Sequence, residues 1–200
     1  MPLEIWFSIA ALTGYLLGSI PFGLLLTRLA GLGDIRDIGS GNIGATNVLR
    51  TGRKDLALAT LILDSFKAGI AVLLLATISG ERNVGLVAGA AAFLGHCYPV
   101  WLQFKGGKGV ATYAGLLVFA SPLGLLVAAP VWLGLFALTR ISSFAALTAA
   151  ALAPAGAFLL GETVFATGTL LVLSALVYWT HRSNIQRLLK GEEPRFGTKS

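Results

Sequence analysis

Apolar stretches long enough to cross a bilayer recur along the whole chain, separated by short polar segments. A transmembrane helix needs about 20 apolar residues. The apolar stretch after residue 109 is too long for one crossing, and Ser121-Pro122 divides it, because the residue before a proline disfavours helix. The pattern predicts helices near residues 5–27, 55–78, 84–102, 110–120, 122–139, 142–160 and 163–180. We therefore interpret the chain as an all-α polytopic membrane protein with seven transmembrane helices, one of them short and half-length.

The composition excludes an ordinary soluble domain. Hydrophobic residues make up 56% of the 200 residues and charged residues only 12%, about half the share in a typical soluble chain. Because seven crossings leave only connecting loops, we predict a single membrane domain over residues 1–200. The N-terminus lacks the basic region of a cleavable signal peptide, so its span is predicted to be permanent. The single cysteine, Cys97, is interpreted as a packing residue.

The distribution of basic residues predicts the orientation, because Lys and Arg are enriched in short cytoplasmic loops. With seven crossings, every basic residue except Arg82 and Lys67 falls on the same side as the C-terminal tail. Six crossings would place Arg140 and the tail on the face opposite the other basic loops. We therefore predict that the N-terminus lies outside and that the C-terminus lies in the cytoplasm.

The short helix near 110–120 has a consequence for the loop before it. Its 11 residues extend over about 16 Å, roughly half of a 30 Å hydrocarbon core. Such a helix completes a crossing only if the preceding loop enters the membrane, where protein or a watery cavity must surround its backbone. We therefore expect the loop 105–109 to lie below the headgroup surface.

Three polar segments of similar composition are predicted on the cytoplasmic face. They are GSGNIGATNVLR at 39–50, KGGKGVAT at 105–112 and HRSNIQRLLKGEE at 181–193. Glycine lets backbone N–H groups approach an anion closely, and Lys or Arg adds full positive charge. The first two segments supply these cations and neutral donors: Arg50, Lys105, Lys108, Ser40, Asn42, Thr46 and Asn47. The pattern indicates a phosphate-binding site, although KGGKGVAT lacks the spacing of a Walker P-loop.

The third segment is predicted to form a short helix that ends at Gly191, with His181 and Asn184 on one face. Two further features remain open. Asp64 and Lys67 lie within a predicted span, where charges are costly and usually functional, but a neutralised pair that ties helices together explains them equally well. His96, before Pro99, is either structural or functional.

Together the three segments resemble the bacterial membrane glycerol-3-phosphate acyltransferases that use acyl phosphate as the donor. The family motifs SGNxGATNxxR, KGGKGxAT and HRxNIxRLxxGxE match here at Ser40–Arg50, Lys105–Thr112 and His181–Glu193 without departure at a fixed position. The resemblance implies a seven-span enzyme of the bacterial cytoplasmic (inner) membrane. Its reaction would transfer the acyl group of acyl phosphate to the sn-1 hydroxyl of glycerol-3-phosphate, giving lysophosphatidate and inorganic phosphate.

The resemblance and the chemistry of the side chains suggest roles for the motif residues. Glycerol-3-phosphate would be bound by Ser40, Arg50, Lys105, His181 and Asn184, of which Lys105, His181 and Asn184 are also the expected catalytic residues. The acyl phosphate would be held by Asn42, Thr46, Asn47, Lys108 and the backbone amides of Gly41, Gly106 and Gly107. Either His181 or a substrate phosphate oxygen would accept the proton of the glycerol hydroxyl.

Two other functions were weighed against this one. An acyltransferase that uses a thioester donor is disfavoured, because neither His96 nor His181 begins a His-x-x-x-x-Asp motif. A transporter of a phosphate-bearing organic anion remains an alternative, although the polar segments gather on one predicted face and the chain shows no internal repeat. We expect no metal site, no cofactor and no nucleic acid partner, and membrane lipid as the surroundings.

Overall fold

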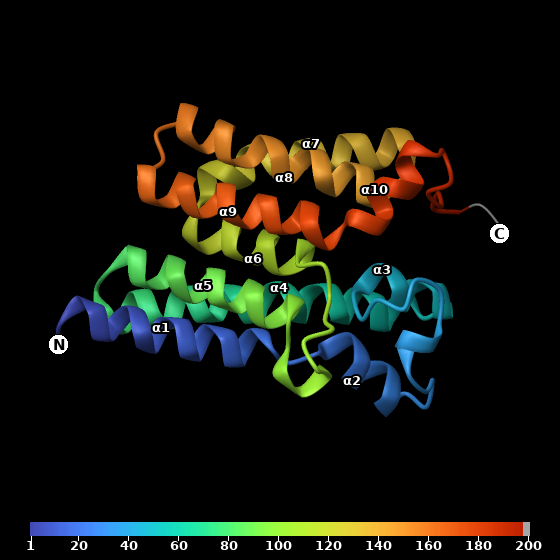
Figure 1. Cartoon of the computed structure of the whole chain (residues 1–200), viewed down its shortest axis with the longest axis horizontal. Coiled ribbons are helices and arrows are strands. Elements are labelled where there is room, and N and C mark those ends of the chain that lie inside the picture. Colours follow the sequence, from blue (N-terminus) through green and yellow to red (C-terminus); the bar gives the residue numbers. More distant parts are fainter. Residues whose placement is uncertain (198–200) are drawn as a thin grey trace. The chain divides into compact units, whose positions relative to one another are not determined.

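The computed structural model describes residues 1–197, which form ten α-helices, three short 3₁₀ helices and no strand (Figure 1). The α-helices are α1 Leu3–Gly18, α2 Phe22–Leu29, α3 Ala45–Val48, α4 Lys54–Ser79, α5 Arg82–Cys97, α6 Val110–Ala120, α7 Pro122–Thr139, α8 Ser142–Leu159, α9 Val164–Thr180 and α10 Arg182–Leu189. The 3₁₀ helices are η1 Ile35–Asp37, η2 Leu49–Thr51 and η3 Val100–Leu102. The prediction of an all-α chain is confirmed for the part of the chain that is described.

Five helical segments of the described chain are long and apolar enough to cross a membrane, or six if α9 and α10 count as one bent span. They are Leu3–Leu29, Lys54–Ser79, Arg82–Leu102, Pro122–Thr139 and Ser142–Leu159, with Val164–Thr180 plus Arg182–Leu189 as the bent pair. The remaining apolar helix, α6, covers the predicted range 110–120 and is 11 residues long. The described chain therefore has five or six candidate membrane spans, and α6 is the short helix of the predicted seven.

Local sequence explains where several helices end. Pro122 occupies the first turn of α7, where its missing N–H costs nothing, and Arg140 in the left-handed region ends that helix. Gly80, also left-handed, ends α4. Helix α5 stops at Cys97, five residues short of the predicted end at 102, because Pro99 disfavours helix at Tyr98.

The first predicted span, 5–27, is interrupted. Helix α1 ends at Gly18 and α2 begins at Phe22, because Pro21 disfavours helix at Ile20 by the same rule that divides the chain at Ser121-Pro122. Helices α1 and α2 together still form one candidate span. At this break the Ile20 carbonyl accepts hydrogen bonds from the Phe22 N–H and from the side chain of Lys67 on α4.

The chain divides into two compact units, Met1–Ala120 and Ser121–Ser200. In the first, α1 packs on α5, and α4 packs on α5 and α6 (Figure 1). Small residues allow close approach of the backbones: a Cβ added at Gly14 would overlap the Ala88 carbonyl, and one at Gly18 would overlap that of Ala92. Glycines on α1 and alanines on α5 therefore allow these two helices to pack closely.

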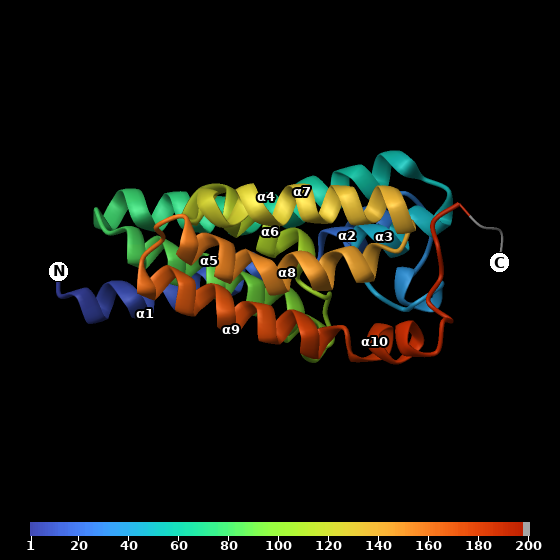
Figure 2. The same ribbon diagram turned by 90° about the horizontal axis from the view of Figure 1, so that it is seen from above.

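In the second unit, α8 packs on α7 and α9, and α10 bends away from α9 by 64° (Figure 2). Ser121 donates a hydrogen bond to the buried carboxyl of Glu162 (3.1 Å), which joins the start of α7 to the α8–α9 turn. Phe196 returns to the turn after α7, where its N–H donates to the Arg140 carbonyl (2.8 Å). The first contact ties the start of α7 to the α8–α9 turn, and the second ties the C-terminal segment to the α7–α8 turn.

Candidate active site

The first polar segment folds around the side chain of Asn47, which is 2% exposed. Its Nδ2 donates to the carbonyls of Ile35 (3.0 Å) and Ile38 (2.9 Å). Its Oδ1 accepts from the backbone N–H (3.0 Å) and the hydroxyl (3.3 Å) of Ser40. Asn47 therefore organises the loop that leads to Ser40, and both of its amide hydrogens are used inside the loop.

Ser40 and Arg50 lie near one another at the surface of this loop. Gly39, with φ of 57°, separates them: a Cβ added there would lie 2.7 Å from Arg50 Nη1 and 2.6 Å from Asn47 Oδ1. Ser40, Thr46 and Arg50 are exposed. The Arg50 guanidinium thus lies against the backbone of Gly39, the residue that precedes Ser40.

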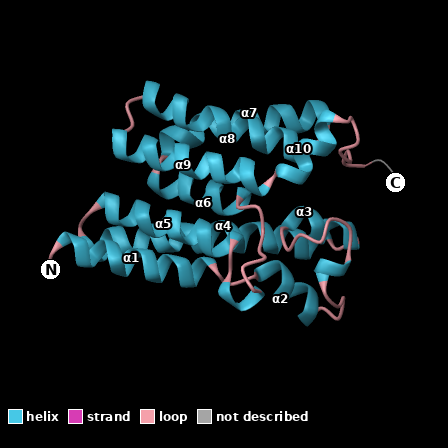
Figure 3. Cartoon of the chain, in the orientation of Figure 1, coloured by secondary structure: helices cyan, strands magenta, loops and turns pink. Residues whose placement is uncertain are grey.

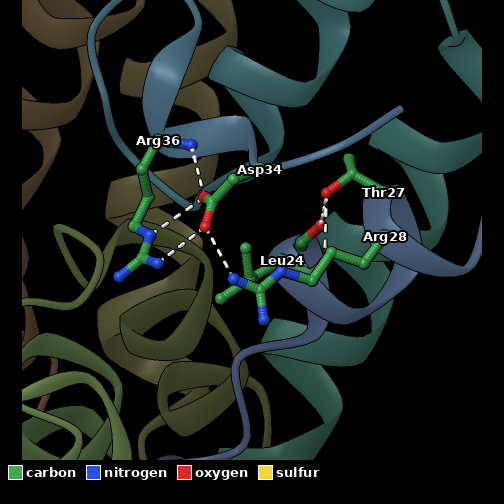
Figure 4. A network of polar contacts seen from close by, with 6 residues as sticks. Leu24, Thr27, Arg28, Asp34 and Arg36 are labelled. Carbon is green, nitrogen blue, oxygen red and sulfur yellow. Dashed lines mark hydrogen bonds and ion pairs between the residues drawn. The ribbon is translucent and has the colours of Figure 1, made fainter. Parts of the chain in front are cut away.

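A charged clamp holds the start of the same loop, drawn mostly without regular structure in Figure 3. Asp34 accepts hydrogen bonds from Arg36 (2.9 and 2.6 Å) and from Arg28 (2.7 Å) (Figure 4). The guanidinium of Arg36, with help from Arg28, holds the pKa of the Asp34 carboxyl well below its usual range. The contact joins the end of α2 to η1.

A small apolar core connects the first segment to the approach of the second. Leu24 of α2, Ile35 and Ile43 of the loop, Val48 of α3 and Ala57 of α4 are buried together. Leu102, three residues before Lys105, packs against this core. The first polar segment and the residues just before the second therefore pack on the same small hydrophobic core, although the two segments are about 55 residues apart in sequence.

The second segment, the glycine loop 105–109, is bound to the end of α5. The Gly106 N–H donates to the Cys97 carbonyl and the Gly107 N–H donates to the His96 carbonyl, both at 3.0 Å. Gly41 in the first segment likewise donates to the Ile38 carbonyl. Each of these three amides, which were expected to cradle a phosphate, has an acceptor within the protein. Lys105 is exposed and Lys108 is half-buried.

The third segment forms α10, with His181 at its N-cap position and Asn184 inside the helix. His181 and Asn184 are buried. His181 Nδ1 lies 2.8 Å from the Val177 carbonyl. A carbonyl only accepts, so Nδ1 carries the proton of the neutral ring and Nε2 keeps its lone pair. Gly191, with φ of 71°, follows the helix end as predicted.

Glu193 and Ser143 are polar partners of this segment that the sequence analysis did not assign. Glu193 accepts hydrogen bonds from Asn184 (2.5 Å), Ser143 (2.7 Å) and Arg187 (2.7 Å). Burial alone would raise the pKa of the Glu193 carboxyl, but these bonds outweigh it and leave the pKa below its ordinary value. Glu193 stands in a recognised motif, whereas nothing in the sequence marks Ser143. Within residues 1–197, no group of three or more His, Cys, Asp or Glu residues is arranged to hold a metal ion.

Comparison with known proteins decides the family. The family model described as glycerol-3-phosphate acyltransferase matches residues 8–191. The chain belongs to the glycerol-3-phosphate acyltransferase family. The glycerol-3-phosphate acyltransferase of Hyphomonas neptunium is 68% identical and aligns over 100% of this chain and 97% of its own length. That of Agrobacterium fabrum is 56% identical over 96% of this chain and 93% of its own.

Solved structures of the same family share the fold. A crystal structure of PlsY (YgiH), an integral membrane glycerol 3-phosphate acyltransferase, in its glycerol 3-phosphate form has a TM-score of 0.89 and 42% identity, with 96% of each chain covered. The lysophosphatidic acid form has a TM-score of 0.87 and 41% identity, again with 96% coverage of each chain. The chain is therefore an acyltransferase of this family, with the family's membrane architecture.

Proposed function

We propose that this protein transfers the acyl group of acyl phosphate to the sn-1 hydroxyl of glycerol-3-phosphate, giving lysophosphatidate and inorganic phosphate. The observation that carries the proposal is that the chain aligns over 96% of its length with a family structure crystallised in both a glycerol 3-phosphate and a lysophosphatidic acid form. The three phosphate-binding motifs and their exposed cations support the same chemistry. We place the enzyme in the bacterial cytoplasmic membrane.

Glycerol-3-phosphate is assigned to Ser40, Arg50, Lys105, His181 and Asn184. Arg50 beside Ser40 supports this assignment, because a guanidinium holds a phosphate through two parallel hydrogen bonds while a hydroxyl adds a neutral donor. Lys105, exposed at the start of the glycine loop, adds a second positive charge. His181 and Asn184 on one face of α10 would contact the glycerol hydroxyls.

Acyl phosphate is assigned to Asn42, Thr46, Lys108 and the glycines at 41, 106 and 107. Because the three glycine amides donate within the protein, the glycines act here by lacking a side chain, which lets the substrate approach the backbone. Lys108 then supplies the charge that offsets the phosphate, and Thr46 a hydroxyl donor. Asn47 holds Ser40 in place and does not bind the donor itself.

The reaction needs positioning more than activation, since acyl phosphate is a mixed anhydride. The glycerol oxygen forms the new bond to the acyl carbon, and the bond from that carbon to the phosphate oxygen breaks, so inorganic phosphate leaves. Holding both substrates in line supplies about 7–11 kcal/mol of barrier lowering. Fixed cations stabilise the departing phosphate. His181 Nε2, which has a lone pair in the tautomer set by Val177, accepts the hydroxyl proton.

We further propose seven crossings, with the N-terminus outside and the C-terminus in the cytoplasm. The 11-residue α6 is half of a crossing, so the glycine loop before it completes the path from below the headgroups. Single cysteines introduced at Glu81 and at Ser183, in a Cys97→Ala background, test this in right-side-out and inside-out membrane vesicles. A membrane-impermeant maleimide is expected to label position 183 from the cytoplasmic side only and position 81 from the outer side only. Labelling from the other side contradicts the orientation.

The test of the reaction uses purified protein with glycerol-3-phosphate and acyl phosphate, with no thioester present. We expect equal amounts of lysophosphatidate and inorganic phosphate. Lys105→Ala and Arg50→Ala should each lower kcat/KM by about tenfold to a hundredfold, the loss expected for one charge-assisted phosphate contact. Lys54→Ala, an exposed cation outside the three motifs, serves as the matched control. Uptake of labelled glycerol-3-phosphate into vesicles without acylated product would favour the transporter and overturn the proposal.

A further inference from the structure

Three ionisable side chains outside the proposed substrate contacts form one buried cluster in the first unit. Asp64 and Lys67 lie on α4 and His96 lies on α5, and all three are at most 4% exposed. Lys67 Nζ lies 2.8 Å from Asp64 Oδ1, 2.9 Å from His96 Nδ1 and 2.9 Å from the Ile20 carbonyl. The contact with Asp64 is an ion pair rather than an aligned hydrogen bond. Lys67 therefore joins α4, α5 and the break between α1 and α2.

The lysine fixes the state and the direction of the His96 ring. An ammonium group only donates hydrogen bonds, so His96 Nδ1 accepts from Lys67 and the neutral ring carries its proton on Nε2. That edge of the ring faces the glycine loop, because a Cβ added at Gly107 would overlap His96 Nε2 and lie 2.6 Å from Cε1. The imidazole thus contacts the backbone of Gly107 directly.

The main chain of His96 holds the same loop. Its carbonyl accepts from the Gly107 N–H, and the neighbouring Cys97 carbonyl accepts from the Gly106 N–H. A Cβ added at Gly106 would overlap the His96 carbonyl. The position of Gly106 and Gly107 therefore depends on that of His96, through both hydrogen bonds and packing. Lys105 and Lys108 flank these two glycines.

We propose that Asp64, Lys67 and His96 are positioning residues for the glycine loop. The proposal rests on the proposed function. Besides joining helices, the charged cluster holds Lys105 and Lys108 where the phosphates of the substrates bind. Asp64 holds Lys67, Lys67 holds the imidazole, and the imidazole supports Gly107. None of the three touches substrate.

Hydrogen exchange at the loop tests this support without any reference to turnover. His96→Asn keeps an acceptor, Oδ1, for Lys67 but removes the ring from Gly107. The double variant Asp64→Asn/Lys67→Met releases the ring while removing both charges together, which avoids a stranded buried charge. Exchange of the peptide covering 103–112 is expected to be about tenfold faster in both variants, with the rest of the first unit unchanged. Cys97→Ala, which leaves the three side chains of the cluster in place, is the matched control.

Two results of the exchange measurement overturn the proposal. Unchanged exchange at 103–112 shows that the cluster does not hold the loop. Faster exchange throughout α1, α4 and α5, with a lower melting temperature, shows that the cluster only maintains the fold. If wild-type protein has no acyltransferase activity, the proposed function fails, while the exchange result still reports whether the cluster holds the loop.

Kinetics then test whether loop position matters to the reaction. In both variants, KM for acyl phosphate or for glycerol-3-phosphate should rise about tenfold or more, because displaced lysines lose charge-assisted contacts with the substrate phosphates, each worth about 1.5–3 kcal/mol, which is about tenfold to a hundredfold in affinity. The change in kcat should be smaller. Faster loop exchange with both KM values unchanged overturns the link to the reaction.

A double-mutant cycle tests the contact between the ring and the glycine. Gly107→Ala alone would overlap His96 Nε2 and should weaken activity strongly. Combined with His96→Ala, the added methyl group has room, so the double variant should lose at least about fivefold less kcat/KM than the product of the two single losses. Strict multiplicativity of the two losses contradicts the direct contact.

Discussion

The Asn184 side chain donates a hydrogen bond from Nδ2 to Glu193 Oε1 at 2.5 Å. This bond joins α10 to the chain that follows it and fixes which end of the amide faces the carboxylate. Ser143 at the start of α8 donates to the same oxygen. A residue proposed to bind substrate is therefore oriented by a carboxylate that itself is anchored to another helix.

Glu193→Gln should lower both stability and activity. The substitution replaces an ionised acceptor of three hydrogen bonds with a neutral amide, at an expected cost of about 1–3 kcal/mol. Because the folded-state pKa of Glu193 lies below the ordinary value of 4.5, its contribution is complete above about pH 4.5 and is lost as the pH falls through the depressed pKa. Thermal unfolding in detergent between pH 3 and 7 measures the loss of stability and its pH dependence, and turnover with acyl phosphate measures the loss of activity.

The neighbouring Glu192→Gln is the control, since Glu192 is exposed. It should leave the melting temperature and its pH dependence unchanged. If Glu193→Gln retains the acid-side loss of stability seen in the wild type, the loss comes from other carboxylates and the assignment to Glu193 is incorrect.

His181→Gln should reduce kcat by about a hundredfold or more, because glutamine can still hydrogen-bond but cannot accept a proton from the glycerol hydroxyl. The tautomer set by the Val177 carbonyl leaves Nε2 as the acceptor. Steady-state turnover with acyl phosphate measures the change. Near-full turnover in the variant would assign the proton to a substrate phosphate oxygen instead.

Asn47→Ala should destabilise the first unit more than it changes any single substrate contact. It removes the Nδ2 bonds to the Ile35 and Ile38 carbonyls, each of which keeps one backbone donor, and takes away the acceptor of the Ser40 N–H, at an expected cost of roughly 1–3 kcal/mol. Thr46→Ala, at an exposed position of the same helix, should leave the melting temperature unchanged and raise KM for acyl phosphate. Equal melting temperatures for the two variants would contradict the structural role of Asn47.

Gly14→Leu should prevent α1 from packing on α5, since even a Cβ at this position would overlap the Ala88 carbonyl. We expect the free energy of unfolding to fall by about 3 kcal/mol or more. Ordinary overpacking costs about 1–3 kcal/mol, and here the overlapping atom belongs to the backbone, which cannot move aside as a side chain can. The control is Gly134→Leu on α7, where an added Cβ meets nothing within 4 Å. Similar expression and melting temperatures for both variants would show that α1 tolerates a wider separation.

Much of the helical layout follows from local sequence. The range 122–139 agrees with α7 at both ends, because Pro122 fixes one boundary and a polar turn at Arg140 fixes the other. The same proline rule predicts an interruption at Ile20-Pro21. Hydropathy alone does not show it, because these residues lie inside a long apolar run. Asp64 and Lys67, three residues apart on one helix face, were visible as a pair, but their third partner, His96, is 29 residues from Lys67.

The sequence by itself determined the membrane-protein class, most helix boundaries and the three polar motifs, because hydropathy, proline and glycine act through neighbouring residues. Only the tertiary structure decided how the polar groups are used. The amides of Gly106 and Gly107 donate to α5, Asn47 supports Ser40, and Glu193 orients Asn184. A donor or acceptor looks the same in a sequence whether it faces a ligand or its own backbone. Packing brings in the partner that satisfies it, and so fixes which groups the fold itself uses.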